Sequence, residues 1–284
     1  MPDILPSHLA ELPPEAAPLT IGGVTLAARD LPRLAGFYAT LLGLEPVPEG
    51  AGLRFDLAGA TLRLLAAPDA RPERGDEPGL FHTAFLMPDR AALAGWLRHA
   101  LALGIRLDGA SDHGVSEALY LSDPEGNGIE VYADRPRALW PRPLWPHPPA
   151  LAQGVAMVTR RLDLQDLLAA TTAADPAPRA TRIGHVHLRA GDLAATEAFY
   201  RGLGLEVMQR MPHASFLASG GYHHHVAINT WGSSGTRPAG LAGLAALTLR
   251  AASEAAFQRA AAALPNGKAT DPSGNLVALI QAET

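Results

Sequence analysis

The apolar residues of this chain follow two periods, first that of a β-strand and then that of an α-helix. Residues 21–27 alternate along one strand and are rich in β-forming side chains. The next apolar residues share one helical face, at positions i, i+3, i+4, i+7 and i+8: Leu34, Phe37, Tyr38, Leu41 and Leu42. Asp30 is placed to cap this helix and Gly43 to end it. Short strands are predicted to follow at 53–57 and 61–65.

Two phrases of this pattern occur twice, which indicates duplicated units. The dipeptide Phe37-Tyr38 returns 162 residues later as Phe199-Tyr200, in each case after a similar strand, GGVTLAARDL or GHVHLRAGDL. The phrase DPEGNGIEV at 123–131 returns 148 residues later as DPSGNLVAL at 271–279. Its first four residues predict a type I turn that leads into a strand. Such repeats predict that one supersecondary unit is built several times.

Four β-α-β-β-β units account for the whole pattern, and they predict an α+β protein. The second unit is predicted to hold one helix, from Arg90 to Leu103, and strands at 80–87, 105–108, 117–122 and 128–133. The third unit runs from Arg182 to Trp231. The fourth begins near Leu241 and ends with a strand at 276–280.

The spacing of the units divides the chain into four parts. We predict an N-terminal tail (1–18), a first tandem pair of units (19–134), a connector (135–180) and a second tandem pair (181–284). The connector contains RPRALWPRPLWPHPPA, and so many prolines prevent regular helix or sheet. A short helix is predicted within it near 162–170, and its tryptophans indicate that it packs against the protein.

Composition excludes several classes of function. The formal net charge of -5 gives no basic surface for a nucleic acid. With no cysteine, disulfides, thiolate catalysis and cysteine metal ligands are excluded. The acidic, proline-rich N-terminus does not read as a signal peptide, and no apolar run approaches the ~18 residues of a membrane helix. We therefore expect a soluble, cytoplasmic protein with neither a nucleic-acid nor a membrane partner.

Units of this kind, entered through DPxGN turns, resemble the vicinal oxygen chelate superfamily, which includes glyoxalase I, extradiol dioxygenases and bleomycin resistance proteins. The phrases at 112–136 (DHGVSEALYLSDPEGNGIEVYADRP) and 220–231 (GGYHHHVAINTW) are similar to bacterial catechol 2,3-dioxygenases of the four-unit type. The resemblance implies two cupped mixed-sheet barrels, each formed by a pair of units. It also implies metal ligands on the first and last strands of a unit.

The four units differ at these ligand positions. The first-strand position is occupied, in chain order, by Gly23, His82, His185 and Ala246. The last-strand position holds Glu130 in unit two and Ala278 in unit four. The resemblance therefore implies that His82, Glu130 and His185 bind the metal. Two imidazoles and one carboxylate form the facial triad that suits Fe(II), and also Mn(II). A metal would also compensate the cost of burying an isolated carboxylate.

Neither tandem pair holds a complete set of ligands, which predicts an unusual pairing of units. We expect units two and three to face each other and form the metal-binding barrel. Units one and four would then form a second, purely structural barrel. In the alternative, units one and two bind the metal with a third ligand from elsewhere, such as His113.

A run of three histidines follows Tyr222 and supplies a candidate for proton transfer. If the run is a strand, His223 and His225 share one face and His224 takes the other. Alignment with the last-strand ligand position favours His224 as the acid–base residue. The resemblance implies that His113 and Tyr120 contact the substrate oxygen or bound dioxygen. His187 shares a strand face with His185 and is a further candidate for the cavity wall.

The leading hypothesis is an Fe(II)-dependent extradiol dioxygenase acting on a small aromatic diol and O2, either as a single chain or as a homodimer. The second hypothesis is a glyoxalase-type lyase or isomerase, in which the histidine run supplies a fourth ligand. The third is a binding or resistance protein that keeps the fold without the metal.

Overall fold

The two periods of the sequence appear as helices and strands in a computed structural model that describes residues 17–142 and 154–282. Unit one contains β1 (Leu19–Ala28), α1 (Leu31–Leu42), β2 (Val47–Glu49), β3 (Gly52–Leu57) and β4 (Ala60–Ala66). Unit two contains β5 (Gly79–Met87), α2 (Arg90–Ala102), β6 (Gly109–Asp112), β7 (Ser116–Ser122) and β8 (Gly128–Asp134). Both units therefore have the predicted β-α-β-β-β order.

The second half of the chain repeats this order with one strand fewer. Unit three contains β10 (Arg182–Arg189), α4 (Leu193–Gly202), β11 (Glu206–Met211), β12 (Ala214–Ala218) and β13 (Val226–Asn229). Unit four contains β14 (Gly243–Ala251), α5 (Glu254–Ala261), the 3-10 turn η4 (Pro265–Gly267), β15 (Lys268–Thr270) and β16 (Leu276–Gln281). The segment between α5 and the DPSGN turn is short, so the described residues form two strands after this helix where the other units form three.

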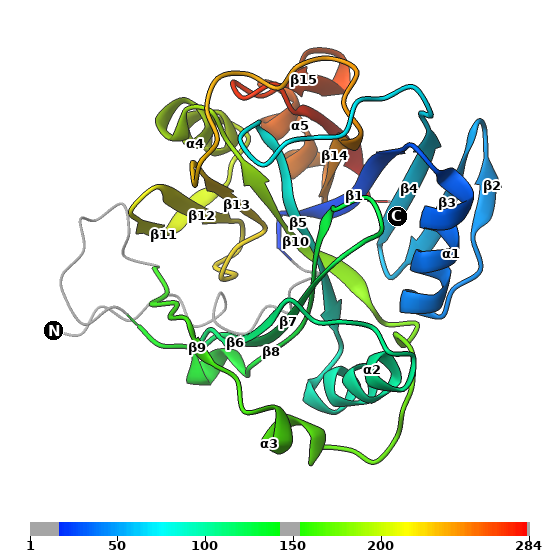
Figure 1. Ribbon diagram of the computed structural model, residues 1–284. Helices are drawn as coiled ribbons and strands as arrows, with labels where there is room; N and C mark the ends of the chain where they lie inside the picture. Colours follow the sequence, from blue (N-terminus) through cyan, green and yellow to red (C-terminus); the bar gives the residue numbers. More distant parts are fainter. Residues whose placement is uncertain (1–16, 143–153, 283–284) are drawn as a thin grey trace, which may run out of the picture.

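The strands assemble into two sheets that combine units from different halves of the chain. The nine-stranded sheet has the order β11-β12-β13-β10-β5-β8-β7-β6-β9 and joins units three and two. The seven-stranded sheet has the order β15-β16-β14-β1-β4-β3-β2 and joins units four and one. The predicted pairing of unit two with unit three is confirmed. Figure 1 shows β5 and β10 side by side near the centre of the molecule.

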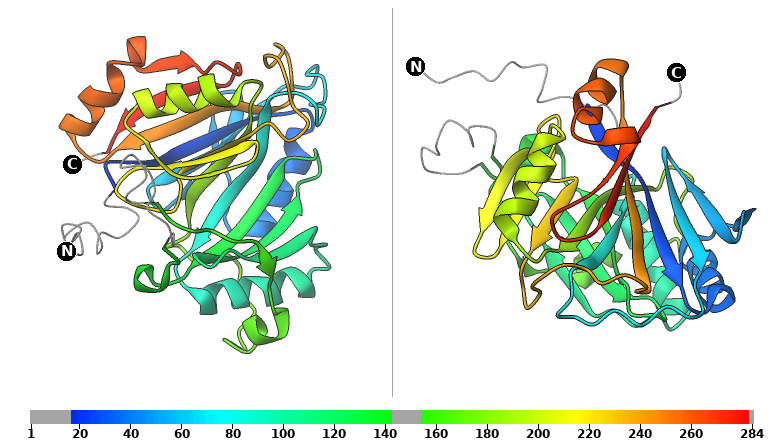
Figure 2. Two further views of the ribbon diagram at one scale, coloured as in Figure 1. Left: turned by 90° about the vertical axis from the view of Figure 1, so that its left-hand side faces the viewer. Right: turned by 90° about the horizontal axis from the view of Figure 1, so that it is seen from above.

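One continuous apolar core lies between the two sheets. It includes Val24 and Leu247 of the seven-stranded sheet together with Phe85 and Val186 of the nine-stranded sheet, all of them fully buried. Figure 2 shows the helices packed around the two sheets, and they add buried side chains such as Leu41, Trp96 and Tyr200 to this core. None of the described helices is long and apolar enough to span a membrane.

The Phe-Tyr dipeptide joins the helix of one unit to the turn of the next. The Tyr38 hydroxyl of α1 donates to Asp123, 3.0 Å away, in the DPEGN turn of unit two. The Tyr200 hydroxyl of α4 donates to Asp271, 3.2 Å away, in the DPSGN turn of unit four. Each aspartate also accepts from backbone N–H groups of its own turn. The two Phe-Tyr copies therefore have the same structural role. Each holds the turn that precedes the last strand of the next unit.

Besides the missing strand of unit four, the structure differs from the predicted elements in two places. The strand predicted at 105–108 forms at 109–112 instead, because Gly104 and the following residues make the turn that leads α2 back to the sheet. The histidine run is not a strand, since β13 begins only at Val226. Gly220 and Gly221 both have positive φ, 63° and 66°, so the chain turns sharply before the run.

The connector is packed against the nine-stranded sheet where it is described. It contains the 3-10 turn η2 (Arg137–Leu139), the short strand β9 (Arg160–Arg161) and the helix α3 (Leu164–Leu168). β9 pairs with β6 at the sheet edge, and α3 confirms the helix predicted in this region. Trp140 lies against Tyr222, with ring centroids 5.8 Å apart. Most of the predicted N-terminal tail and the centre of the connector lie outside the described residues.

Candidate metal centre and its cavity

Three adjacent strands at the middle of the nine-stranded sheet carry the predicted ligands on one face. Ala84 of β5 pairs with Glu130 on β8 on one side and with His185 on β10 on the other. His82 lies two residues before Ala84 on β5, and residues two apart in a strand point to the same face. The sequence placed these side chains in separate units, and the sheet order brings them together.

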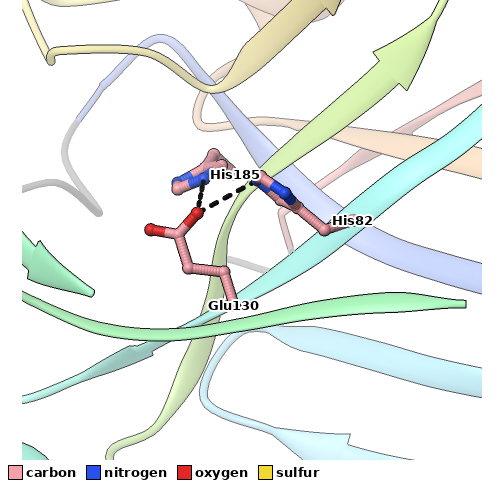
Figure 3. Close-up of side chains that lie close together, drawn as sticks. All are labelled: His82, Glu130 and His185. Atoms are coloured by element: carbon pink, nitrogen blue, oxygen red, sulfur yellow. Dashed lines mark hydrogen bonds and ion pairs between the residues drawn. The ribbon is translucent and has the colours of Figure 1, made fainter. Parts of the chain in front are cut away.

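The three side chains converge on one point (Figure 3). The Nε2 atom of His82 lies 3.0 Å from Oε2 of Glu130, and Nε2 of His185 lies 3.2 Å from the same oxygen. One ligand atom from each residue lies within 4.8 Å of the other two. All three residues are buried. Two side chains that bind the same ion lie within about 6 Å of each other, because each ligand bond is roughly 2 Å long. The three side chains are well within this distance.

The protonation states of the cluster are those that bind a cation. Burial alone would raise the pKa of Glu130, but the neighbouring His185 and His82 outweigh it and hold that pKa well below the usual value. Burial lowers the pKa of His185 to about 4, against the opposing attraction of Glu130. At neutral pH the cluster is thus a carboxylate beside a neutral imidazole, and metal binding requires ligands in these forms.

A divalent metal fits this cluster. The Nε2 atom of His82 is buried and has no hydrogen-bond partner in the structure, although Glu130 lies near it. An ion held between the three residues would accept the lone pair of this nitrogen. Ligands about 2.1 Å from one ion and at right angles to each other are about 3 Å apart, and both nitrogen–oxygen distances of the cluster are close to this spacing. The His82, Glu130 and His185 cluster can therefore bind a divalent metal.

The seven-stranded sheet has no such cluster at the matching positions among the described residues. Its register places Thr25 opposite Arg63 and Thr248 opposite Ala278, as Ala84 lies opposite Glu130 in the other sheet. Arg63 thus takes the place of the glutamate, and its Nε atom donates to Glu49 2.7 Å away. At Gly23, a Cβ atom would lie 2.7 Å from the Thr61 carbonyl oxygen. The prediction that units one and four lack metal ligands at these positions agrees with this register.

A cavity of about 520 Å³ opens beside the metal ligands. Its wall combines strands of units two and three with Met157, Val158 and Thr159 of the connector. The phenylalanine, tryptophan and methionine side chains that line it are Phe81, Phe216, Trp231, Met157 and Met211. His82 and Glu130 also line it, so a small molecule in the cavity would reach the ligand cluster.

The histidine run places one of its three side chains in this cavity. His224 lines the cavity, and its ring lies 4.1 Å from the ring of His185. Burial lowers the pKa of His224 well below its usual value, and the neighbouring histidines lower it further. His223 is fully buried behind it, and His225 accepts a hydrogen bond from the Ser219 backbone. The face assignment predicted for a strand does not apply, but His224 does face the cavity.

His113 and Tyr120 form a hydrogen-bonded pair on the opposite wall. The Nε2 atom of His113 lies 2.7 Å from the Tyr120 hydroxyl, and its Nδ1 atom lies 2.8 Å from the Val158 carbonyl. Tyr120 pairs with Glu130 across β7 and β8, so it shares the face of the ligands. Burial and the nearby Glu130 raise the pKa of Tyr120 well above its usual value. These contacts hold His113 outside the ligand cluster, which disfavours its role as a third ligand.

His187 lies beside His82 in the cavity wall. The two residues pair across β10 and β5, and their ring centroids are 5.0 Å apart. Asn229 lies 2.9 Å from Nε2 of His187, and the rings of Phe81 and Trp231 contact it from the cavity side. His187 is not part of the cluster of ligand atoms.

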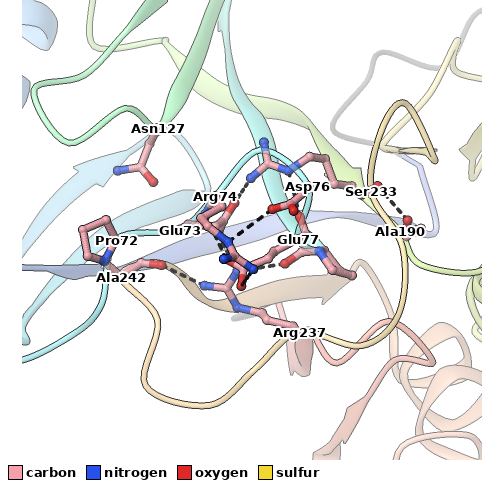
Figure 4. A network of polar contacts seen from close by, with 12 residues as sticks. Pro72, Glu73, Arg74, Asp76, Glu77, Asn127, Ala190, Ser233, Arg237 and Ala242 are labelled. Atoms are coloured by element: carbon pink, nitrogen blue, oxygen red, sulfur yellow. Dashed lines mark hydrogen bonds and ion pairs between the residues drawn. The ribbon is translucent and has the colours of Figure 1, made fainter.

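A network of ion pairs surrounds Glu73 and Arg237 (Figure 4). Glu73 pairs with both Arg189, which lines the cavity, and Arg237. Arg237 also donates to the carbonyl oxygens of Pro78 and Ala242, at 3.0 and 2.8 Å. The network joins the loop before β5 to the loop before β14. Glu73 is shared by two guanidinium groups, so it offsets only part of their positive charge.

Two residues near the site are not among those predicted from the sequence. Asp134 hydrogen-bonds the buried His223, and Arg189 is held by Glu73. A signal for Asp134 was present, because Glu130, Tyr132 and Asp134 alternate along one strand and so share a face. No local pattern in the sequence points to the Arg189 pair, since Glu73 lies in a loop 116 residues earlier in the chain.

Comparison with known proteins places the chain in a family. The family described as "Glyoxalase/Bleomycin resistance protein/Dioxygenase superfamily" matches residues 20–131 and 182–265. The catechol-2,3-dioxygenase of Bacillus subtilis (strain 168) is 38% identical over 232 residues, which are 77% of this chain and 77% of that protein. Biphenyl-2,3-diol 1,2-dioxygenase 2 of Rhodococcus globerulus is 31% identical over 115 residues, covering 39% of this chain and 60% of that protein.

The fold comparison agrees with this placement. The crystal structure of glyoxalase I from Zea mays superposes with a TM-score of 0.51 at 16% identity, covering 93% of this chain and 92% of that one. The likeness at this identity concerns the fold alone. The family match and the 38% identity over most of the chain show that the protein belongs to the glyoxalase/bleomycin resistance protein/dioxygenase superfamily, in which it is a catechol-2,3-dioxygenase-like enzyme.

Proposed function

We propose that the protein is an extradiol dioxygenase that opens the ring of a catechol-type diol with O2. The observation that carries the proposal is the convergence of His82, Glu130 and His185 beside the cavity. In the reaction, the ring C–C bond next to the diol breaks and both atoms of O2 enter the product. The product carries one carboxylate and one aldehyde or ketone group.

The three clustered residues would hold Fe(II), with Mn(II) as the second choice. A facial triad of two imidazoles and one carboxylate suits both ions. When bound, the metal supplies open positions for the two diol oxygens and for O2, and it brings the reactants together. Glu130 contributes the negative charge that offsets part of the charge of the ion.

His224 is the candidate for proton transfer. It lies against His185 and lines the cavity, so a diol bound at the cluster would lie within its reach. Burial and the surrounding histidines keep its pKa low, so the ring is neutral at physiological pH. A neutral imidazole can accept a hydroxyl proton of the substrate and later return it.

The opposite wall is suited to orient the substrate oxygens. The Tyr120 hydroxyl lies beside His113 on the face of the sheet that carries Glu130. Because burial and Glu130 raise the pKa of this phenol, it stays protonated and can donate a hydrogen bond. His113 is fixed in turn by the Val158 carbonyl, so the pair holds one orientation.

The cavity wall favours an uncharged substrate. Phe81, Phe216 and Trp231 surround the space with aromatic rings. Arg189 is the one Lys or Arg residue of the described cavity wall, and it is already paired with Glu73. A carboxylate on the substrate ring would lose its hydration and would have to compete with Glu73 for Arg189. We therefore expect catechol and alkyl catechols to be better substrates than dihydroxybenzoates.

The proposal is tested by loading the metal-free protein with Fe(II) under anaerobic conditions and then adding catechol and oxygen. Stoichiometric oxygen uptake and a yellow ring-opened product are expected. The matched control is Glu130→Gln, which keeps the side-chain volume but removes the charge. Oxygen-independent conversion of a glutathione hemithioacetal with Ni(II) or Zn(II), without ring cleavage by the Fe(II) form, would instead assign a glyoxalase-type reaction.

A further inference from the structure

The proton-transfer candidate His224 is the end of a hydrogen-bonded chain that runs away from the cavity. Its Nδ1 atom lies 2.8 Å from Nδ1 of His223. The Nε2 atom of His223 lies 2.9 Å from Oδ1 of Asp134, at the end of β8. His223 has no exposed surface and does not line the cavity. Its ring therefore cannot contact a substrate, and its hydrogen bond into the site goes to His224, although its ring also lies 6.0 Å from that of His185.

The Asp134 carboxylate is held by further donors. The Tyr222 hydroxyl lies 2.9 Å from Oδ2 and 3.2 Å from Oδ1 of Asp134. The Tyr132 hydroxyl lies 2.8 Å from that of Tyr222 and extends the chain. Gly184 leaves the space for this arrangement, since a Cβ atom there would lie 1.9 Å from the Tyr132 hydroxyl oxygen. The carboxylate is thus fixed in position by the residues around it.

The direction of the hydrogen bonds follows from what each group can donate. An ionised carboxylate only accepts, so His223 donates its Nε2–H to Asp134. A neutral imidazole carries one proton, which leaves Nδ1 of His223 as an acceptor. The contact between the two Nδ1 atoms then requires that His224 donates its Nδ1–H. The Nε2 atom of His224, on the other side of its ring, is left with a lone pair.

We infer that Asp134 and His223 are positioning residues that fix the tautomer of His224, so that the lone pair of its Nε2 atom faces the cavity. An imidazole in the other tautomer would present an N–H to the substrate and could not accept its proton. The inference rests on the proposed function for its catalytic meaning. The tautomer itself is a property of the protein without metal or substrate.

The direct test is long-range 1H–15N NMR of the metal-free protein labelled with 15N-histidine, near pH 7.5. The signals of His224 are identified by their loss in His224→Gln. We expect Nε2 of His224 to resonate as an unprotonated nitrogen and Nδ1 as a protonated one. A His224 that carries its proton on Nε2 overturns the inference.

Two variants test whether Asp134 and His223 are the cause. In Asp134→Asn, the amide N–H can donate to His223 while its oxygen accepts from Tyr222, so the bonds reverse and His224 gains its proton on Nε2. His223→Phe keeps a ring in place but removes the acceptor, so both tautomers of His224 are expected. If either folded variant keeps the wild-type tautomer of His224, the inference is overturned.

Kinetics of the Fe(II)-loaded variants separate positioning from general damage. We expect kcat of Asp134→Asn to fall at least about 10²-fold, the lower end of what acid–base catalysis contributes. KM should change by less than about twofold, because no substrate contact is removed. The matched control is His225→Asn, which changes the neighbouring histidine outside the cavity and should keep both constants. A change in KM alone, with kcat unchanged, contradicts the inference.

The two proposals fail in different ways. If the NMR result is as expected but no ring cleavage occurs, the tautomer assignment stands and the dioxygenase proposal fails. If ring cleavage occurs but His224 has its proton on Nε2, only the positioning inference fails.

Discussion

The two sheets of this protein have the same strand order over most of their width, yet they differ at the positions that could bind a metal. In the nine-stranded sheet, β5, β8 and β10 carry His82, Glu130 and His185. In the seven-stranded sheet, the matching strands carry Gly23, Arg63 and Ala246. Units one and four contain no histidine at all. Duplication has thus supplied the scaffold twice, and of the two sheets only the one from the middle of the chain holds the candidate ligands at these positions.

The largest effect is expected from removing the charge at the last-strand position. Glu130→Gln should abolish metal binding near neutral pH and lower kcat/KM by at least about 10³-fold, because the facial triad loses its anion. The measurement is metal content by element analysis together with oxygen uptake. Its partner in the other sheet is Arg63→Gln, which places the same side chain at the matching position.

Arg63→Gln should leave metal content and activity unchanged. It removes a partly exposed pair with Glu49 and a hydrogen bond to the Thr61 hydroxyl, so its effect on the free energy of unfolding should stay within about 1 kcal/mol. A loss of metal in Arg63→Gln would show that the two sheets are not functionally separate.

Acid should destabilise the metal-free protein through the nine-stranded sheet. The pKa of His225 is about 3 in the folded protein, because burial disfavours its charged form, against an ordinary value of 6.5. Between these values the unfolded chain binds a proton that the folded chain does not, so stability is complete above pH 6.5 and falls below it. At pH 5 this group alone costs on the order of 2 kcal/mol. His185 acts in the same direction.

Thermal unfolding of the metal-free protein at pH 7.5 and pH 5 checks this expectation, and His225→Asn should reduce the difference. Hydrogen exchange at pH 5 should show earlier opening of β10 and β13 than of β1 and β14. Equal loss of protection in both sheets would argue against a histidine origin.

In the seven-stranded sheet, Gly23 takes the position of His82, and we expect that no side chain fits there. Gly23→Ala should lower the free energy of unfolding by about 1–3 kcal/mol, since the added Cβ atom would meet the Thr61 carbonyl and hydroxyl oxygens. Gly36→Ala on the exposed side of α1 is the matched control, because its Cβ atom meets nothing within 4 Å. It should stabilise the protein by about 0.5–1 kcal/mol. Urea unfolding of both variants measures the difference in sign.

The smallest effect is expected from removing the hydroxyl of Tyr38 or of Tyr200, which have the same structural role. Tyr38→Phe and Tyr200→Phe should each cost about 1 kcal/mol, because a buried aspartate loses one of its donors. Only Tyr38 holds the turn that leads into β8 and Glu130. Metal affinity should therefore fall, by up to about tenfold, in Tyr38→Phe alone. Equal metal affinity in the two variants would mean that the turn does not position Glu130.

Much of this organisation could be predicted because it depends on residues that recur. The repeats of the Phe-Tyr and DPxGN phrases predicted the four units, and the missing ligands in units one and four predicted that unit two pairs with unit three. The local shape of the histidine run could not be predicted, because two glycines with positive φ set it before β13 begins. The contacts of Asp134 with His223 and of Glu73 with Arg189 also depend on chain segments that meet only in the folded protein.

The pairing of units within each sheet also fixes the order in which the two sheets can be completed during synthesis. Every strand of the nine-stranded sheet precedes residue 230, so the whole ligand cluster exists before unit four is made. β1 must wait for its neighbour β14, because Leu19 pairs with Ala251. Until then β1 has an unpaired edge, and unit four, which is made after the other three units, covers it.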